Sequence, residues 1–171
     1  MKTTIAIAIV MMMAPASAMA QNPDKSSRGE VYFFGGLFAS KSIGYPSVPA
    51  GGVNAGFGGD LFLDKRWAVG AEAGYANASN YYSLGTGSID LSCHFLGHQN
   101  RRKIDPFVTG GYSIYYGNRG ANSGYNFGGG VNFWVAKHVA SRLEIRDNGH
   151  SEPQFAGIGN FAAFRAGVTF R

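Results

Sequence analysis

The stretch from Asn148 to Glu152 brings together a histidine, a serine and a glutamate, the residue types of an acyl-transfer triad. His150 and Ser151 are adjacent, so a β-strand would point their side chains to opposite faces. Both residues come just before Pro153, which favours a solvated loop. The sequence therefore predicts no catalytic residues here.

The other residues that could bind a metal or a cofactor are scattered. His98 and His138 stand near predicted turns and show no metal-ligand spacing. Cys93 is the only cysteine, which excludes an internal disulfide framework and a cysteine-based zinc site. The glycine runs at 110–111 and 128–130 lack the strand–loop–helix context of a phosphate-binding loop. No metal and no cofactor is expected.

Composition indicates what kind of scaffold carries these residues. The 171-residue chain contains 26 glycines and 24 aromatic residues (13 Phe, 9 Tyr and 2 Trp), but only 15% of its residues are charged. Ordinary soluble domains contain about 7% glycine and about 25% charged residues. This balance favours an all-β chain that does not depend on a charged surface for solubility. The formal net charge of +5 is too small to indicate a nucleic-acid partner.

Residues 1–20 have the pattern of a secretory signal peptide. Lys2 precedes an apolar run from Ile5 to Ala14, and Ala18-Met19-Ala20 matches a small-x-small cleavage site. We therefore expect a mature chain that begins near Gln21. Residues 21–28 are predicted to be a flexible lead-in, and residues 29–171 a single domain.

Eight segments of this domain show the two-residue alternation of β-strands. They run over 29–40, 51–62, 66–77, 85–96, 104–117, 124–135, 138–148 and 160–171. Nearly all have about 10–12 residues, the length of a tilted strand that crosses a membrane. Short connections are expected on one side of the barrel. Polar connections, at about 41–50, 78–84, 118–123 and 149–159, are expected on the other, and two of them are longer.

The two faces of each segment predict which side meets lipid. In 138–148, Leu143 and Ile145 alternate with Arg142, Glu144 and Arg146. Polar faces rich in glycine, with isolated charges of both signs, suit the crowded interior of an eight-stranded barrel. Apolar faces, with Tyr and Trp near the strand ends, suit contact with lipid. The predicted lumen charge network is Asp60, Glu72, Asp90, Arg142, Glu144, Arg146 and Arg165.

The segments "DPFVTGGYSIYYG", "YNFGGGVNFWVAKHVASRLEIRD" and "FRAGVTFR" resemble the OmpA/OmpX-like outer membrane protein β-barrel domain family. The resemblance covers roughly residues 29–171. It implies an eight-stranded antiparallel up-and-down transmembrane β-barrel in the bacterial outer membrane. It also implies contact with outer-membrane lipid, and recognition of Gly167 and Phe170 by the barrel-insertion machinery as an assembly signal. The last segment departs from the family by ending on Arg171 and not on the aromatic residue.

The function expected from these patterns is a non-enzymatic barrel with a side-chain-filled lumen. It would serve envelope integrity or surface interaction through its external loops. One alternative is a lipid A-modifying barrel enzyme of the deacylase type, which should carry His and Ser two residues apart on a lipid-facing strand. The other is a soluble secreted β-barrel that binds an apolar ligand.

Overall fold

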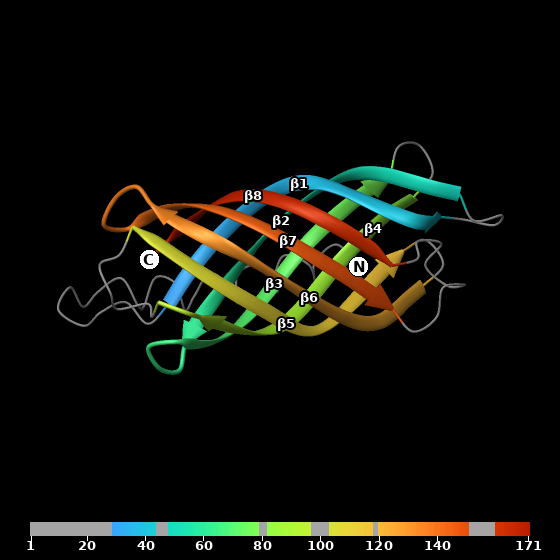
Figure 1. Cartoon of the computed structure of the whole chain (residues 1–171). Helices are drawn as coiled ribbons and strands as arrows, with labels where there is room; N and C mark the ends of the chain where they lie inside the picture. Colours follow the sequence, from blue (N-terminus) through green and yellow to red (C-terminus); the bar gives the residue numbers. More distant parts are fainter. Residues whose placement is uncertain (1–28, 44–47, 79–81, 97–102, 118–119, 151–159) are drawn as a thin grey trace, which may run out of the picture.

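The computed structural model describes residues 29–43, 48–78, 82–96, 103–117, 120–150 and 160–171. Eight strands within these residues form one closed barrel (Figure 1). Their bounds are Gly29–Ile43 (β1), Val48–Phe62 (β2), Trp67–Ala78 (β3), Tyr82–His94 (β4), Ile104–Gly117 (β5), Gly120–Trp134 (β6), Val139–His150 (β7) and Phe161–Phe170 (β8). The predicted signal peptide (1–20) and lead-in (21–28) lie outside the described residues.

Every strand pairs antiparallel with its neighbour in the chain, and β1 closes on β8. The closing seam extends from Val31 opposite Phe170 to Ser40 opposite Phe161. The closed sheet leaves no unpaired strand edge, which a bilayer requires because lipid cannot satisfy backbone hydrogen bonds. The predicted eight-stranded up-and-down barrel is confirmed. None of the described residues forms a helix long and apolar enough to cross a membrane.

The barrel has two different ends, which we name by their connections. The turn end, on the left of Figure 1, carries Gly29, Arg171 and the connections 63–66, 95–103 and 135–138. The loop end carries the connections that follow β1, β3, β5 and β7. Several strands extend further toward the loop end than the sequence predicts. For example, β1 continues to Ile43 and not only to residue 40, and β2 begins at Val48 and not at residue 51. Backbone pairing continues there because a ladder of hydrogen bonds does not need an alternating apolar face.

The outer surface is apolar and the interior is polar, as the alternation predicts. Leu37, Ile89, Phe127 and Ile145 are each more than 60% exposed on the outside of the barrel. The aromatic residues near strand ends do not all follow the prediction. Trp134 is buried at the turn end of the lumen, because its place in the alternation of β6 directs it inward.

Two tight turns at the turn end have the same construction. In 63–66 the N–H of Leu63 donates to Trp67 O, and in 135–138 the N–H of Val135 donates to Val139 O, at 2.9 and 3.0 Å. Asp64 Oδ1 also accepts the N–H groups of Arg66 (2.6 Å) and Trp67 (2.7 Å). The hydrogen bonds from Trp67 and Arg66 lower the pKa of the Asp64 carboxyl, because they favour its charged form.

Candidate functional site

The seven charged residues predicted for the lumen all lie inside the barrel. Three are on β7, and the others are on β2, β3, β4 and β8. None exposes more than 7% of its surface. Because each alternates with outward apolar residues, the strand period alone directs all seven inward.

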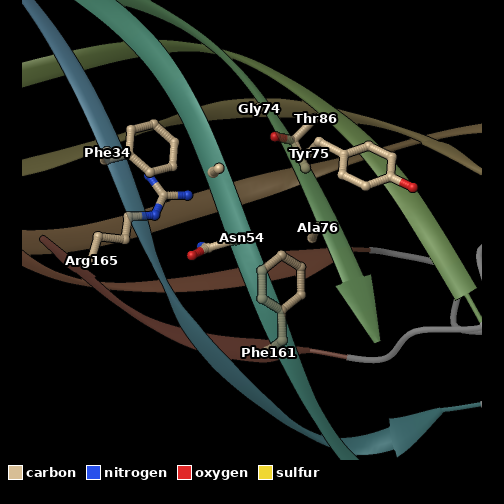
Figure 2. Close-up of a pocket in the computed structure, with 9 residues that line it drawn as sticks. Phe34, Asn54, Gly74, Tyr75, Ala76, Thr86, Phe161 and Arg165 are labelled. Atoms are coloured by element: carbon tan, nitrogen blue, oxygen red, sulfur yellow. The ribbon is translucent and has the colours of Figure 1, made fainter. Parts of the chain in front are cut away.

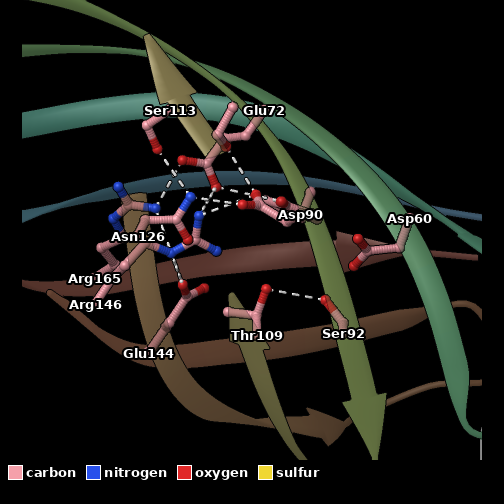
Figure 3. Close-up of polar contacts among 12 residues, drawn as sticks. Asp60, Glu72, Asp90, Ser92, Thr109, Ser113, Asn126, Glu144, Arg146 and Arg165 are labelled. Carbon is pink, nitrogen blue, oxygen red and sulfur yellow. Dashed lines mark hydrogen bonds and ion pairs between the residues drawn. The ribbon is translucent and has the colours of Figure 1, made fainter. Parts of the chain in front are cut away.

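Arg146 is the centre of this charge network (Figure 3). Its Nη1 atom donates to Asp90 Oδ2 at 3.2 Å and lies 3.4 Å from Glu72 Oε2. Its Nε atom donates to Glu144 Oε1. These carboxylates come from β4, β3 and β7, so Arg146 connects strands on different sides of the lumen. A guanidinium that is 1% exposed needs such partners, since an unpaired buried charge is costly.

Arg165, on β8, extends the network toward the loop end. Its Nη1 atom donates to Glu72 Oε1 at 2.8 Å and lies 4.0 Å from Glu144 Oε1. Its guanidinium also lies over the Phe34 ring, 4.3 Å from the centroid. The two carboxylates are therefore each shared between arginines.

Arg142 extends the network toward the turn end. Its Nε and Nη2 atoms both lie 3.0 Å from Glu144 Oε2, while Asp60 Oδ2 is more distant at 3.8 Å. The guanidinium lies between the rings of Tyr32 and Phe107, 4.1 Å from each centroid. Two aromatic faces and one close carboxylate thus surround this cation.

Neutral side chains complete the carboxylate shells, and the sequence did not predict them as partners of the charged residues. Tyr32 donates to Glu72 Oε2 at 3.2 Å. Asn126 Nδ2 donates to Asp90 Oδ1 at 2.7 Å, and Ser88 donates to Asp90 Oδ2 at 2.8 Å. All three donors lie in the inward phase of their strands, which is the sequence signal that could have identified them.

An apolar plug lies in the lumen on the loop-end side of the charges. Its members are buried: Phe38, Ala76, Ala78, Leu84, Tyr115, Phe161 and Ala163. The rings of Phe38 and Phe161 are 5.3 Å apart, and Tyr115 meets Phe161 edge to face at 6.2 Å. These contacts fill this part of the interior by van der Waals packing.

A small cavity lies between the plug and the charges (Figure 2). Phe161 borders it on the plug side, and Arg165, Asn54 and Thr86 contribute polar atoms. It has room for about one water molecule. A space of this size, with polar walls, does not form a path for solutes.

The turn-end part of the lumen contains a buried histidine–aspartate contact that the sequence did not predict. His94 Nδ1 lies 2.7 Å from Asp105 Oδ2. The His94 ring is 0% exposed and lies 4.9 Å from Phe62 and 5.4 Å from Phe107. His94 lies in the inward phase of β4, and Asp105 lies near the start of β5, so barrel pairing brings the two side chains together inside the lumen.

The remaining candidates from the sequence form no site within the described residues. His150 is the last residue of β7 and not part of the predicted loop, because β6 continues far enough to pair with it at Gly124. Ser151, Glu152 and His98 lie outside the described residues. Among the side chains that the structure describes, no group of His, Cys, Asp and Glu could hold a metal ion.

The two residues of the predicted assembly signal have different environments. Phe170 points outward and is 44% exposed, with its ring 6.5 Å from that of Phe33 on β1. Gly167 lies at the closing seam opposite Phe34. A Cβ atom at position 167 would meet the backbone carbonyl of Phe33, so glycine permits close approach of β8 to β1.

Comparison with known proteins identifies the fold. No family model matches the chain, and no curated protein matches it. Among solved structures, Neisserial surface protein A has a TM-score of 0.66 at 14% identity, covering 86% of this chain and 99% of that one. The N-terminal β-barrel domain of Pseudomonas aeruginosa OprF has a TM-score of 0.61 at 15% identity, covering 83% and 95%. The outer membrane protein OprG from Pseudomonas aeruginosa has a TM-score of 0.52 at 9% identity, covering 83% and 92%. The chain thus has the eight-stranded transmembrane barrel fold of bacterial outer-membrane proteins.

Proposed function

We propose that this protein is a non-enzymatic barrel of the bacterial outer membrane that conducts no solutes. It serves envelope integrity or surface interaction through its loop-end connections, and it is related to the OmpA/OmpX-like barrels. One observation carries the proposal: the lumen of the described barrel is filled by a paired charge network and an apolar plug. Such an interior can support the wall of the barrel but offers no route through it.

The outer surface supports the membrane location. Leu37, Ile89, Phe127 and Ile145 belong to a set of large apolar side chains exposed around the whole barrel. Exposed apolar area of this extent is unfavourable in water and favourable against lipid chains. Outer-membrane lipid is therefore the first partner. We further propose that the barrel-insertion machinery reads Gly167 and Phe170 during assembly.

Reconstitution tests the closed lumen. The purified barrel is refolded into phospholipid vesicles, and sugar permeation is measured by vesicle swelling, with a large general porin as the positive control. We expect swelling no faster than in protein-free vesicles. Permeation at a rate near that of the porin would contradict a closed lumen. A monomer that stays soluble without detergent would contradict the membrane location and favour the soluble barrel.

A deletion strain tests the biological role. Loss of the gene is expected to increase sensitivity to detergents or to abolish a surface contact, with lipid A acyl chains unchanged by mass spectrometry. A change in lipid A acylation that the restored gene reverses would favour the enzyme alternative. Complementation with a chain in which residues 151–159 are replaced by a Gly/Ser linker separates the two roles. Envelope integrity needs only the barrel, whereas a surface interaction made through that connection would be lost.

A further inference from the structure

The turn end of the barrel carries exposed basic side chains on each of its connections. Lys65 and Arg66 are exposed in the first, Lys103 in the second and Lys137 in the third. We call these four residues the basic collar. They come from positions far apart in the sequence, and barrel closure distributes them around one rim.

Little negative charge opposes the collar. Asp64 is the only exposed acidic residue among the described turn-end residues, and its carboxylate accepts the N–H groups of Arg66 and Trp67 within its own turn. Glu30 and Asp105 also lie near this end, but they are 2% and 5% exposed inside the lumen. The outward potential of the rim is therefore positive.

The loop end lacks this excess of positive charge. Its four connections, 44–47, 79–81, 118–119 and 151–159, contain one basic residue, Arg119, and one acidic residue, Glu152. The three turn-end connections, 63–66, 95–103 and 135–138, contain six basic residues and one acidic residue. The positive charge thus belongs to one side of the membrane.

Large apolar side chains place the collar at the level of lipid headgroups. Leu63 and Val135 are 68% and 72% exposed at the first residues of the two tight turns. Trp67, 45% exposed, directly follows Arg66, and Ile104, 50% exposed, directly follows Lys103. Basic side chains beside an apolar belt can lay their aliphatic stems on lipid while the charged groups reach the headgroups.

We propose that the basic collar binds the phosphates of anionic glycerophospholipids, of the phosphatidylglycerol class, in the leaflet that surrounds the turn end. The proposal rests on the proposed membrane location. Each basic residue close to an anionic membrane surface contributes enough attraction for a preference of roughly fivefold. Several such residues on one rim concentrate these lipids around the turn end and fix the depth of the barrel.

Trp67 supplies a local probe of the surrounding lipid. The chain has two tryptophans, and Trp134 is buried in the lumen, so a Trp134→Phe background leaves Trp67 as the only fluorophore of this type. This chain is reconstituted in phosphatidylcholine vesicles that contain a minor fraction of phosphatidylglycerol. Bromine is placed on the acyl chains of one lipid or the other. Quenching of Trp67 then reports which of the two lipids lies next to the collar.

We expect brominated phosphatidylglycerol to quench Trp67 several-fold more than its mole fraction predicts, with the excess declining at high salt. The variant Lys65→Gln/Arg66→Gln/Lys103→Gln/Lys137→Gln, which neutralises all four residues of the collar, should lose most of this excess. The control variant Lys41→Gln/Arg119→Gln should retain the excess. It removes one basic residue near the end of β1 and one in the connection between β5 and β6, both away from the collar. Heat-dependent gel migration verifies that each variant is folded.

Two results would overturn the collar. Quenching by phosphatidylglycerol in proportion to its mole fraction would show that no preference exists. A preference that persists in the quadruple variant would show that the four collar residues do not produce it. Failure of the membrane location itself looks different, because neither brominated lipid would then quench Trp67.

Discussion

Glu144 is the residue whose loss should damage the lumen most clearly. It accepts hydrogen bonds from both Arg142 and Arg146, and it is 4% exposed. The substitution Glu144→Gln preserves the volume but removes the charge and replaces one acceptor oxygen by a donor group. Arg146 keeps Asp90 and Glu72, at 3.2 and 3.4 Å. Arg142 does not keep a close carboxylate.

The expected cost follows from this difference between the two arginines. Removing one partner of a buried ion pair costs about 3–5 kcal/mol. Because Arg146 retains two carboxylates and Arg142 retains Asp60 at 3.8 Å, we expect the lower end, about 3 kcal/mol. The double variant Arg142→Met/Glu144→Gln also removes the buried cation that Glu144→Gln leaves without a close carboxylate. It should therefore be more stable than Glu144→Gln alone.

The control is a neutral hydrogen bond in the same lumen. Ser92 donates to Thr109 Oγ1 at 3.1 Å, and both side chains are buried. Ser92→Ala should cost only about 1 kcal/mol. The free energy of unfolding is measured for each variant by reversible urea titration in phospholipid vesicles, followed by tryptophan fluorescence. If Glu144→Gln costs no more than Ser92→Ala, water reaches the charges and the reasoning about a dry network is wrong.

Three further predictions test the outer surface, the seam and a turn. Leu143→Arg, near the middle of the apolar belt, should cost about 2–4 kcal/mol in urea unfolding, whereas Phe170→Arg at its edge should cost about 0–1; equal costs would contradict contact with a bilayer. Gly167→Ala should impair refolding into detergent without any assembly machinery, because its added Cβ would meet the backbone of β1. The control Gly87→Ala, whose added Cβ has no neighbour nearer than 4.0 Å, should refold normally. If both variants refold normally, the role of Gly167 is recognition by the barrel-insertion machinery and not packing at the seam. The pKa of Asp64 is lowered in the folded turn, so its stabilisation is present above the carboxyl's unfolded pKa and is lost as pH falls through the folded value. Amide exchange in this turn, corrected for intrinsic pH dependence, should increase over that acidic range and should already be fast in Asp64→Asn at neutral pH.

The sequence by itself determined which residues face inward and which face outward. Leu143 and Ile145 alternate with Arg142 and Glu144, and in an extended chain successive side chains point to opposite faces whatever the rest of the protein does. The same local rule gave the number of strands. The rule was less accurate for strand bounds at the loop end. There β1 continues to Ile43 and β2 begins already at Val48, because backbone pairing continues where the alternation stops.

Only the tertiary structure decided which of the inward residues are partners. Arg165 donates to Glu72, 93 positions away, and Arg146 to Asp90, 56 positions away. The sequence placed all four in the lumen but could not predict these pairs. Partners across a lumen depend on the number of strands and on the stagger with which the last strand meets the first. That stagger belongs to the closed sheet as a whole, so no single segment contains it.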